Sequence, residues 1–556
     1  MTTLIPPKPK RQRKNPTLTT STVDPNGTAP SIVCQFRNAK DGTLLGPSVS
    51  LPADTGRQGL ELLVNNLRGT AEDPVPFAFH IQLPSSKTST TTTTTAADDG
   101  KTLEEGLRLT ISKSIHQDLL TDPKHAHKLS TEDVFVIDCE PEAVFRVREI
   151  TRCSSSLDGH ASPILCASFS PTGQYLATGS GDNTCRLWNL ASETPSQTLQ
   201  GHQNWVLCVE WDGLERFVAT GSMDNTVRLW DPKTGKESGS GSGGSGGAMK
   251  GHTKWITSLS WEPVHLNVEN PRLCSSSKDS TVRVWNPRTR KLEFTLGGHT
   301  ASVNQVRWGG EGVIYTASSD RTVKLWDGKD GKLIRTLSEH AHWVNTLALN
   351  TDFILRTGPF DQHAKQPTSN EHARELARKR YDEFTQTTPE QLISGSDDHT
   401  LFLWPPLRDA QTGQGPANPK KPVARLTGHQ KQVNHVAWSP DGRFIASAGF
   451  DNSVKLWDGR TGKFIASLRG HVAAVYRVSW SSDSRMLVSA SKDSTLKLWD
   501  LKTFKIRVDL PGHSDEVYCV DFVADKIASG GRDKKHVGQT INVEQDRLGR
   551  HESYDR

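Results

Sequence analysis

Residues 201–231 read GHQNWVLCVEWDGLERFVATGSMDNTVRLWD, with a Gly-His pair at the start, Asp224 in a turn and Leu229-Trp230-Asp231 at the end. The Gly-His pair or a near variant occurs eight times, and successive His residues are mostly 41 to 50 residues apart. In seven of the eight units a Trp follows the turn Asp by six residues. Self-similarity at a period of this size is typical of a chain that stacks copies of one supersecondary unit.

The period and the short strand-like runs within each unit predict a mainly β fold, an eight-bladed β-propeller. The Gly-His pair, the turn Asp and the strand Trp resemble the WD40 repeat very specifically. The units begin at His160, His202, His252, His299, His340, His429, His471 and His513. The turn Asp and strand Trp pairs are Asp182 and Trp188, Asp224 and Trp230, Asp279 and Trp285, Asp320 and Trp326, Asp398 and Trp404, Asp451 and Trp457, and Asp493 and Trp499.

We interpret these recurring polar residues as structural. The His, a strand hydroxyl such as that of Thr178, the turn Asp and the Trp are expected to form a buried hydrogen-bonded chain, because each polar group would be costly to bury alone. The same residue types make a catalytic triad, but a catalytic site does not recur eight times. The sequence also lacks a GxxxxGK[ST] loop and an HExxH motif, so we expect a non-catalytic protein.

Length and composition indicate more than one domain. Eight blades use about 390 of the 556 residues, which leaves room for a domain before them. We expect a disordered basic tail over residues 1–30, a small domain over 31–148, the propeller over 149–539 with a helical insertion at 359–390, and a charged tail over 540–556. The eight Cys form no CxxC pair, and no apolar run is long enough to cross a bilayer, so we expect a reduced compartment, no structural zinc and no membrane span.

The net charge of +5 matches a basic run in the first fifteen residues, formed by Lys8, Lys10, Arg11, Arg13 and Lys14. Two interpretations fit this run. One is a nuclear-import signal or a loose nucleic-acid contact, and the other is a solvated tail.

Residues 31–148 predict a small α+β sheet. Residues 32–36 and 44–49 flank an Asp41-Gly42 turn, which indicates a hairpin, and the Leu residues between 60 and 67 suit a short helix. Residues 77–81 and 134–139 read as further strands, separated by a Thr-rich stretch (88–95) expected to be a loop. This order is typical of a ubiquitin-like β-grasp domain.

The chain as a whole resembles the Notchless family, in which a ubiquitin-like domain precedes eight WD40 repeats. The resemblance rests on PEAVFRV at 141–147, TRCSSSL at 151–157, GHQNWVLC at 201–208, KWITSLSWEP at 254–263 and DLPGH at 509–513, which occur in the same order as in the family. It implies a non-catalytic assembly factor of the large ribosomal subunit, acting as a monomer within the pre-60S particle in the nucleolus and nucleoplasm. It further implies that the ubiquitin-like domain is gripped by the metal-ion-dependent adhesion domain of midasin, an AAA+ ATPase.

The resemblance also points to a residue for this grip. Glu132 occupies the position of the family's loop Glu, and a carboxylate on an exposed loop could complete the coordination of Mg²⁺ held by the partner. Asp133 is its nearest rival, and Glu72, Asp73, Glu104 and Glu105 are weaker ones.

Other contact residues are open to two interpretations. Trp205, Trp255 and Trp343 each follow a blade His by three residues, where they could contact a partner or simply pack. The insertion in unit five predicts one helix capped by Ser369-Asn370, whose apolar face would lie on the propeller or on a partner. Residues 238–247 read as a flexible linker between blades two and three.

The eighth unit departs from the pattern because Gln539 stands where a Trp is expected. This puts the third strand of that blade in doubt, and an alternative splice form or an error in the C-terminal sequence would explain the departure. The resemblance implies that residues around 143–147 supply the outermost strand of this blade. The competing function is a WD40 scaffold or substrate receptor in ubiquitin-ligase or Notch signalling.

Overall fold

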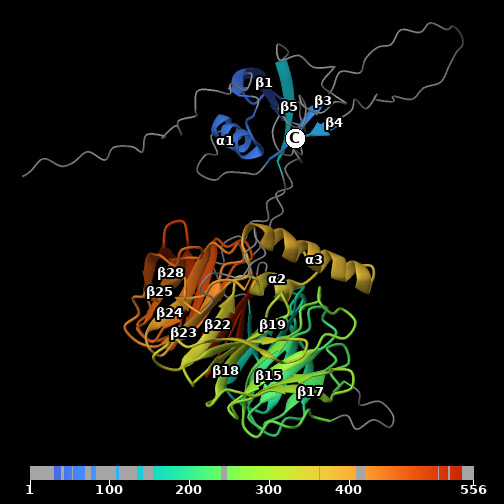
Figure 1. Cartoon of the computed structure of the whole chain (residues 1–556), viewed down its shortest axis with the longest axis vertical. Helices are drawn as coiled ribbons and strands as arrows, with labels where there is room; N and C mark the ends of the chain where they lie inside the picture. The colour runs from blue at the N-terminus through green and yellow to red at the C-terminus, as the bar shows by residue number, and fades with distance from the viewer. Residues whose placement is uncertain are drawn as a thin grey trace, which may run out of the picture. The chain divides into compact units, whose positions relative to one another are not determined.

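The computed structural model describes residues 31–38, 43–52, 54–68, 77–82, 108–111, 134–141, 155–238, 247–361, 364–407, 420–510, 512–523 and 526–540. The chain divides into two compact units, residues 1–144 and 145–556 (Figure 1). The basic run, the Thr-rich stretch, the Asp41-Gly42 turn and residues 541–556 lie outside the described residues.

The first unit contains one helix and a five-stranded sheet in the order β2-β1-β5-β3-β4. Its elements are β1 (Ser31–Asn38), β2 (Val49–Pro52), α1 (Arg57–Leu67), β3 (Phe77–Gln82), β4 (Arg108–Thr110) and β5 (Val134–Pro141). β1 and β5 pair in parallel at the centre of the sheet, and Leu60 and Val64 of α1 are buried with Phe36, Phe79 and other residues of the sheet. This is the expected β-grasp arrangement.

The predicted hairpin strand at residues 44–49 is wrong in its position. β2 begins at Val49, and Leu44 contributes only an isolated bridge to Arg37. The pairing of Cys34 with Val49 and of Arg37 with Leu44 differs in register, so the ladder is interrupted between them.

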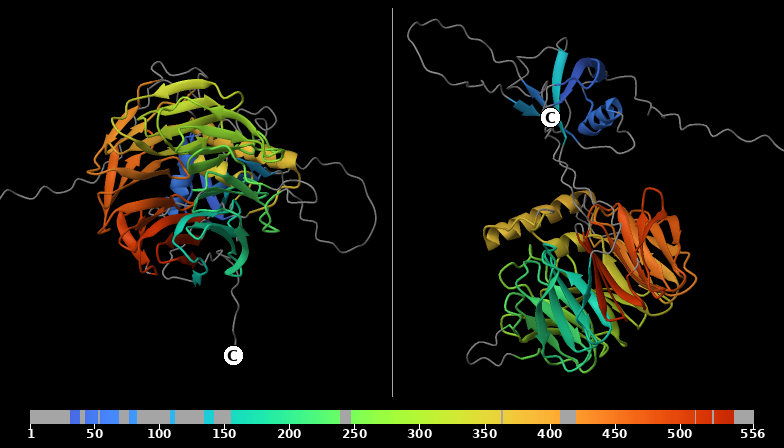
Figure 2. Two further views of the ribbon diagram at one scale, coloured as in Figure 1. Left: turned by 90° about the horizontal axis from the view of Figure 1, so that it is seen from below. Right: turned by 180° about the vertical axis from the view of Figure 1, so that it is seen from behind.

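The second unit is a ring of eight antiparallel sheets that follow one another in chain order (Figure 2), which confirms the mainly β propeller. The first four blades are β7 (Ile164–Phe169), β8 (Tyr175–Ser180), β9 (Thr184–Asn189) and β10 (Thr194–Gln200); β11 (Val206–Trp211), β12 (Val218–Ser222) and β13 (Val227–Trp230); β14 (Ile256–Trp261), β15 (Leu273–Ser277), β16 (Val282–Trp285) and β17 (Leu292–Leu296); and β18 (Val303–Trp308), β19 (Val313–Ser318), β20 (Val323–Asp327) and β21 (Leu333–Leu337). The next three are β22 (Val344–Leu349), β23 (Leu392–Ser396), β24 (Thr400–Leu403) and β25 (Ala424–Thr427); β26 (Val433–Trp438), β27 (Phe444–Gly449), β28 (Ser453–Asp458) and β29 (Phe464–Arg469); and β30 (Val475–Trp480), β31 (Met486–Ser491), β32 (Leu496–Asp500) and β33 (Lys505–Leu510). Buried side chains of neighbouring blades pack together, so that the core is continuous around the ring.

Blade eight closes the ring with strands from both ends of the unit. It consists of β34 (Val517–Val523), β35 (Lys526–Gly531), β36 (Lys535–Thr540) and, outermost, β6 (Ser155–Asp158). The third strand is therefore present although Gln539 replaces the Trp. The expectation that residues 143–147 form the closing strand is wrong, because β6 occupies that place. The outermost strand of a blade ends just before the His of the next blade, and in the closed ring the blade after blade eight is blade one. β17 ends at Leu296 before His299, and β6 ends at Asp158 before His160.

Blade two has an interrupted outer strand. In blade three, Val282 and Trp285 pair with Leu296 and Leu292. The corresponding Val227 and Trp230 of blade two are bridged by Met249 and Glu237, which are much farther apart in the chain. Residues 239–246, predicted to link blades two and three, fall in the chain between these two bridging residues and lie outside the described residues.

The insertion in blade five contains two helices, α2 (Asp352–Thr357) and α3 (Asn370–Thr387), on one face of the propeller (Figure 1). Only α3 was expected from the sequence, and its cap is as expected, since Ser369 accepts a hydrogen bond from His372 N at 3.2 Å. Ala373 and Ala377 pack against Val264 and Val268 of blade three. The apolar face of α3 is therefore covered by the propeller itself.

A buried carboxylate holds the end of this insertion. Glu390 accepts hydrogen bonds from Gly310 N at 2.8 Å, Tyr315 Oη at 3.1 Å and Tyr381 Oη at 3.2 Å. Burial raises the pKa of Glu390 to about 7. The contacts link α3 to blade four, because Tyr381 is a helix residue and Tyr315 lies in β19.

Candidate functional site

The structure brings the His, Asp, hydroxyl and Trp residues together inside each of the first seven blades. In blade one, His160 Nδ1 lies 2.8 Å from Asp182, His160 Nε2 lies 2.9 Å from Thr178 Oγ1, and Trp188 Nε1 donates to the same oxygen at 2.8 Å. The same contacts recur in the next two blades, around His202, Asp224 and Trp230, and around His252, Asp279 and Trp285. The arrangement is repeated and closed, with every polar group engaged by another member of the set.

The strand Trp residues of blades four to seven are placed in the same way. All four are buried, and each indole Nε1 donates to the hydroxyl that also contacts the His of its own blade. These donors and acceptors are Trp326 to Thr316 at 3.0 Å, Trp404 to Ser394 at 2.8 Å, Trp457 to Ser447 at 2.9 Å and Trp499 to Ser489 at 2.8 Å. The Trp residues therefore hold the blades together from within and present no polar group to a ligand.

The turn Asp residues are anionic in the folded state. Burial by itself raises the pKa of Asp493, but hydrogen bonds from Thr495, His471 and the backbone outweigh it and hold the pKa at about 2. In blade eight, His513 Nδ1 lies 2.9 Å from Asp533 Oδ2, and His513 Nε2 lies 2.9 Å from Ser529 Oγ. The pKa is lowered in the same way for Asp182, Asp320, Asp398 and Asp451.

The three sequence-predicted Trp residues lie on the loops that lead into the innermost strands. Trp205, Trp255 and Trp343 are 49%, 39% and 52% exposed. Lys278 Nζ lies 4.4 Å from the centre of the Trp255 ring. These loops are at the opposite end of the innermost strands from the insertion that carries α2 and α3, because the insertion follows the end of β22. We call this surface the Trp face.

The innermost strands surround a central channel with a cavity of about 380 Å³. Side chains near the Trp face join neighbouring blades. Asn304 Nδ2 donates to Val344 O at 2.8 Å, Asn434 Nδ2 donates to Tyr476 O at 2.6 Å, and Thr257 Oγ1 donates to Val303 O at 2.6 Å. These polar side chains therefore fix the spacing of the blades.

Helix α2 lies across the other end of the channel and is held by ion pairs. Arg356 of α2 contacts Asp521 of blade eight at 2.8 Å. Arg307 of blade four lies 3.8 Å from Asp352 of α2 and 3.5 Å from Glu210 of blade two. Sequence reasoning missed this network. The signal was available, since Glu210, Arg307 and Asp521 occupy the same position in three innermost strands, four residues after the first Val.

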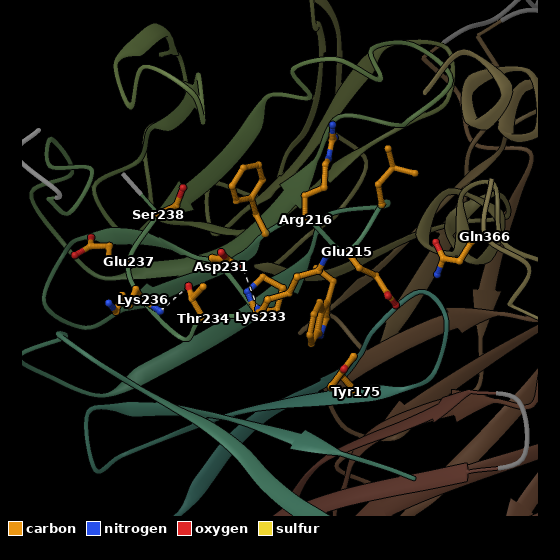
Figure 3. A pocket seen from close by; sticks show the side chains of 14 residues that line it. Tyr175, Glu215, Arg216, Asp231, Lys233, Thr234, Lys236, Glu237, Ser238 and Gln366 are labelled. Atoms are coloured by element: carbon orange, nitrogen blue, oxygen red, sulfur yellow. Dashed lines mark hydrogen bonds between the residues drawn. The ribbon is translucent and has the colours of Figure 1, made fainter. Parts of the chain in front are cut away.

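A second cavity of about 730 Å³ lies at the surface beside blade two (Figure 3). Its charged groups are mostly engaged: Glu215 accepts hydrogen bonds from Thr172, and Arg216 donates to Asp212. Within the described part of the chain, no group of three His, Cys, Asp or Glu residues could hold a metal ion, and no helix is long and apolar enough to cross a membrane.

Glu132 and Asp133 lie outside the described residues, as do Glu72, Asp73, Glu104 and Glu105. In the sequence, Glu132 and Asp133 directly precede β5, a central strand of the sheet. The roles of these acids stay predictions.

Comparison with known proteins gives matches over most of the chain. The NLE (NUC135) domain family matches residues 32–86. The family described as WD domain, G-beta repeat matches six segments at 151–189, 193–231, 244–286, 290–327, 420–458 and 462–500. Blades five and eight are not among the six, which agrees with the insertion in one and the missing Trp in the other.

Several relatives match most of this chain. Ribosome assembly protein 4 of Saccharomyces cerevisiae is 46% identical over 84% of this chain and 85% of that protein. The Notchless protein homolog of Arabidopsis thaliana is 44% identical over 76% of this chain and 80% of its own length. Protein Notchless of Drosophila melanogaster is 42% identical over 72% of this chain and 73% of its own length. A computationally designed protein, Ika8, has a similar fold with a TM-score of 0.53 and 24% identity, covering 70% of this chain and 100% of its own.

Proposed function

Because the chain belongs to the Notchless family, we propose that it is a non-catalytic assembly factor of the large (60S) ribosomal subunit. The observation that carries the proposal is the 46% identity to a protein named Ribosome assembly protein 4, which extends over 84% of this chain and includes both units. Identity confined to the propeller would carry no function, since propellers serve many. The place of action that follows is the nucleus, in the nucleolus and nucleoplasm.

The two units have separate tasks in this proposal. The propeller docks on the pre-ribosomal particle, and the ubiquitin-like unit is the handle that midasin grips. The exposed Trp205, Trp255 and Trp343 support docking through the Trp face, because exposed aromatic side chains are frequent anchors of protein interfaces. The four-residue strand β6 is the first described element of the propeller unit after the handle, so tension on the handle reaches the propeller through this strand.

The proposed contact with midasin is a carboxylate that binds the Mg²⁺ of the partner's adhesion domain. This cation takes oxygen ligands at about 2.0 to 2.1 Å in a strict geometry, so the position of the donor atom matters. Glu132 would supply the oxygen, and Asp133 is the neighbouring candidate. This chain needs no cofactor of its own for such a role.

The test is binding of the full chain to the midasin adhesion domain with Mg²⁺ or with a chelator. We expect Glu132→Ala to abolish the metal-dependent part of binding, and Glu132→Asp to weaken it strongly because the shorter side chain moves the oxygen. Asp133→Ala is the matched control and should bind as the wild type does. Binding that needs neither Mg²⁺ nor Glu132 would contradict the proposed contact.

The second candidate is a general WD40 scaffold, as in a ubiquitin-ligase receptor or a Notch-signalling hub. The names of two relatives, which contain the word Notchless, favour the Notch link alone. Sedimentation of a cell extract separates the two. An assembly factor travels with pre-60S particles, whereas a scaffold of this other kind travels in light complexes.

A further inference from the structure

The central channel has a middle ring of side chains with a single charged member. Every innermost strand has a register shift between its first and third residues, and the third residues define the ring. These are Cys166, Cys208, Ser258, Gln305, Thr346, His435, Arg477 and Cys519. The second residues, one step closer to the Trp face, are Leu165, Leu207, Thr257, Asn304, Asn345, Asn434, Tyr476 and Tyr518. Within these two rings, a group that enters from the Trp face meets one charged side chain, Arg477, before it reaches the ion pairs of α2. At the rim, the carboxylates of Asp397 and Glu516 accept hydrogen bonds from Asn345 and Tyr476 of the outer ring.

Arg477 lines the cavity and makes no hydrogen bond or ion pair with any described residue. The other two Arg residues of the cavity differ from it, because Arg356 contacts Asp521 and Arg307 contacts Glu210 and Asp352. A guanidinium group has five N–H donors, and a partly buried one without partners favours an anion. Arg477 thus has no direct partner, although its charge acts on Glu210. Burial raises the pKa of that carboxyl, and the charges of Arg307, Arg356 and Arg477 oppose the rise.

Two other residues of the middle ring supply hydrogen-bond donors without competing for the anion. His435 is uncharged, because burial, together with the positive charges of Arg477 and Arg307, lowers its pKa well below the usual value. Gln305 uses its Oε1 to accept from Leu347 N at 2.7 Å, so its amide N–H groups are the part left for a ligand. Both residues belong to the middle ring.

We propose that the channel binds the carboxylate of an acidic side chain, presented by a partner protein on the Trp face and paired with Arg477. The cavity of about 380 Å³ has room for one such side chain. The exposed Lys254 and Lys278 lie on loops of the same face, which favours an acidic partner. A carboxylate fits better than a phosphate, because Glu210 and Asp521 lie at the next level of the channel and repel a dianion more strongly. This inference is independent of the midasin contact.

The test uses the full chain and three capped pentapeptides of Gly with a central Glu, Gln or phosphoserine. Ligand-observed NMR at millimolar peptide concentration detects weak binding. We expect the Glu peptide to bind, the Gln peptide to lose at least tenfold in affinity, and the phosphoserine peptide to bind more weakly than the Glu peptide.

Variants then locate the site. Arg477→Gln should reduce the affinity for the Glu peptide at least tenfold, Arg477→Lys should retain part of it, and Arg321→Gln, an exposed Arg on the same face, should change it less than twofold. Thermal unfolding checks that each variant is folded. The proposal is overturned if no peptide binds, if the Glu and Gln peptides bind alike, if the phosphoserine peptide binds best, or if Arg321→Gln weakens binding as much as Arg477→Gln.

Discussion

Ring closure by β6 and β36 leads to a disulfide that should stabilise the propeller. Ser156 and Val537 are paired in the antiparallel ladder of these strands. In blade two, Val227 and Met249 donate to each other, which makes them a hydrogen-bonded pair. His536 holds the position of Val227, three residues after the turn Asp, so the next pair, Ser156 with Val537, is a non-hydrogen-bonded one. Such pairs bring the Cα atoms to about 4.5 Å, which lies within the range a disulfide bridges.

The magnitude follows from the size of the loop that the Ser156→Cys and Val537→Cys double variant closes. The pair encloses about 380 residues, for which the loss of unfolded-state entropy has a ceiling of about 6 kcal/mol. Measured disulfides deliver less, so we expect about 2 to 4 kcal/mol in the free energy of unfolding. With an unfolding entropy of about 2.1 cal/mol/K per residue over the unit formed by residues 145–556, this raises Tm by about 2 to 5 °C.

The assay compares the oxidised and reduced forms of the double variant in denaturant and thermal unfolding, with each single variant as control. The thiols of the described residues should not interfere, since they are buried or partly buried. For example, burial raises the pKa of Cys34 to about 11 and that of Cys519 to about 12. If the disulfide does not form under mild oxidation, the register is wrong. If it forms and the oxidised protein is no more stable than the reduced one, the closing of this blade does not limit the stability of the ring.

Three further outcomes are expected. The pKa of Asp493 is held at about 2 against an ordinary 3.8, so the stability that its carboxylate contributes is fully present above about pH 4 and is lost as the pH falls toward 2. Circular dichroism during an acid titration should show progressive unfolding between these two pH values, and an unchanged signal would contradict this prediction. Thr178→Ala removes the hydroxyl that contacts both His160 and Trp188, and should lower the free energy of unfolding, measured in denaturant, by about 1 to 3 kcal/mol. Thr178→Ser keeps the hydroxyl and should lower it less. Equal losses in the two variants would count against the hydrogen-bonded chain. Deletion of residues 239–246 should rejoin the outer strand of blade two and leave Tm unchanged or higher, and a lower Tm would show that the segment has a structural role.

The sequence by itself determined the propeller, because each blade repeats a local pattern of His, Asp and Trp whose members meet within one unit. The cap and the buried face of α3 were predictable for the same reason, since Ser369, Ala373 and Ala377 act within or beside one helix. The β-grasp order of the first unit also followed from local strand and helix signals, although β2 lies later than the turn indicated.

The tertiary structure decided the features that depend on residues far apart in the chain. Ser155–Asp158 is too short and too polar to read as a strand, and it becomes one because β36 offers an open edge about 380 residues later. Likewise, nothing local distinguishes Arg477 from Arg307. Only the ring distinguishes them, because it brings Glu210 and Asp352 within ion-pair distance of Arg307 and leaves Arg477 without an ion pair in the described structure. Local periodicity specifies the blades, whereas closure and the charge balance of the channel arise only when all eight blades share one axis.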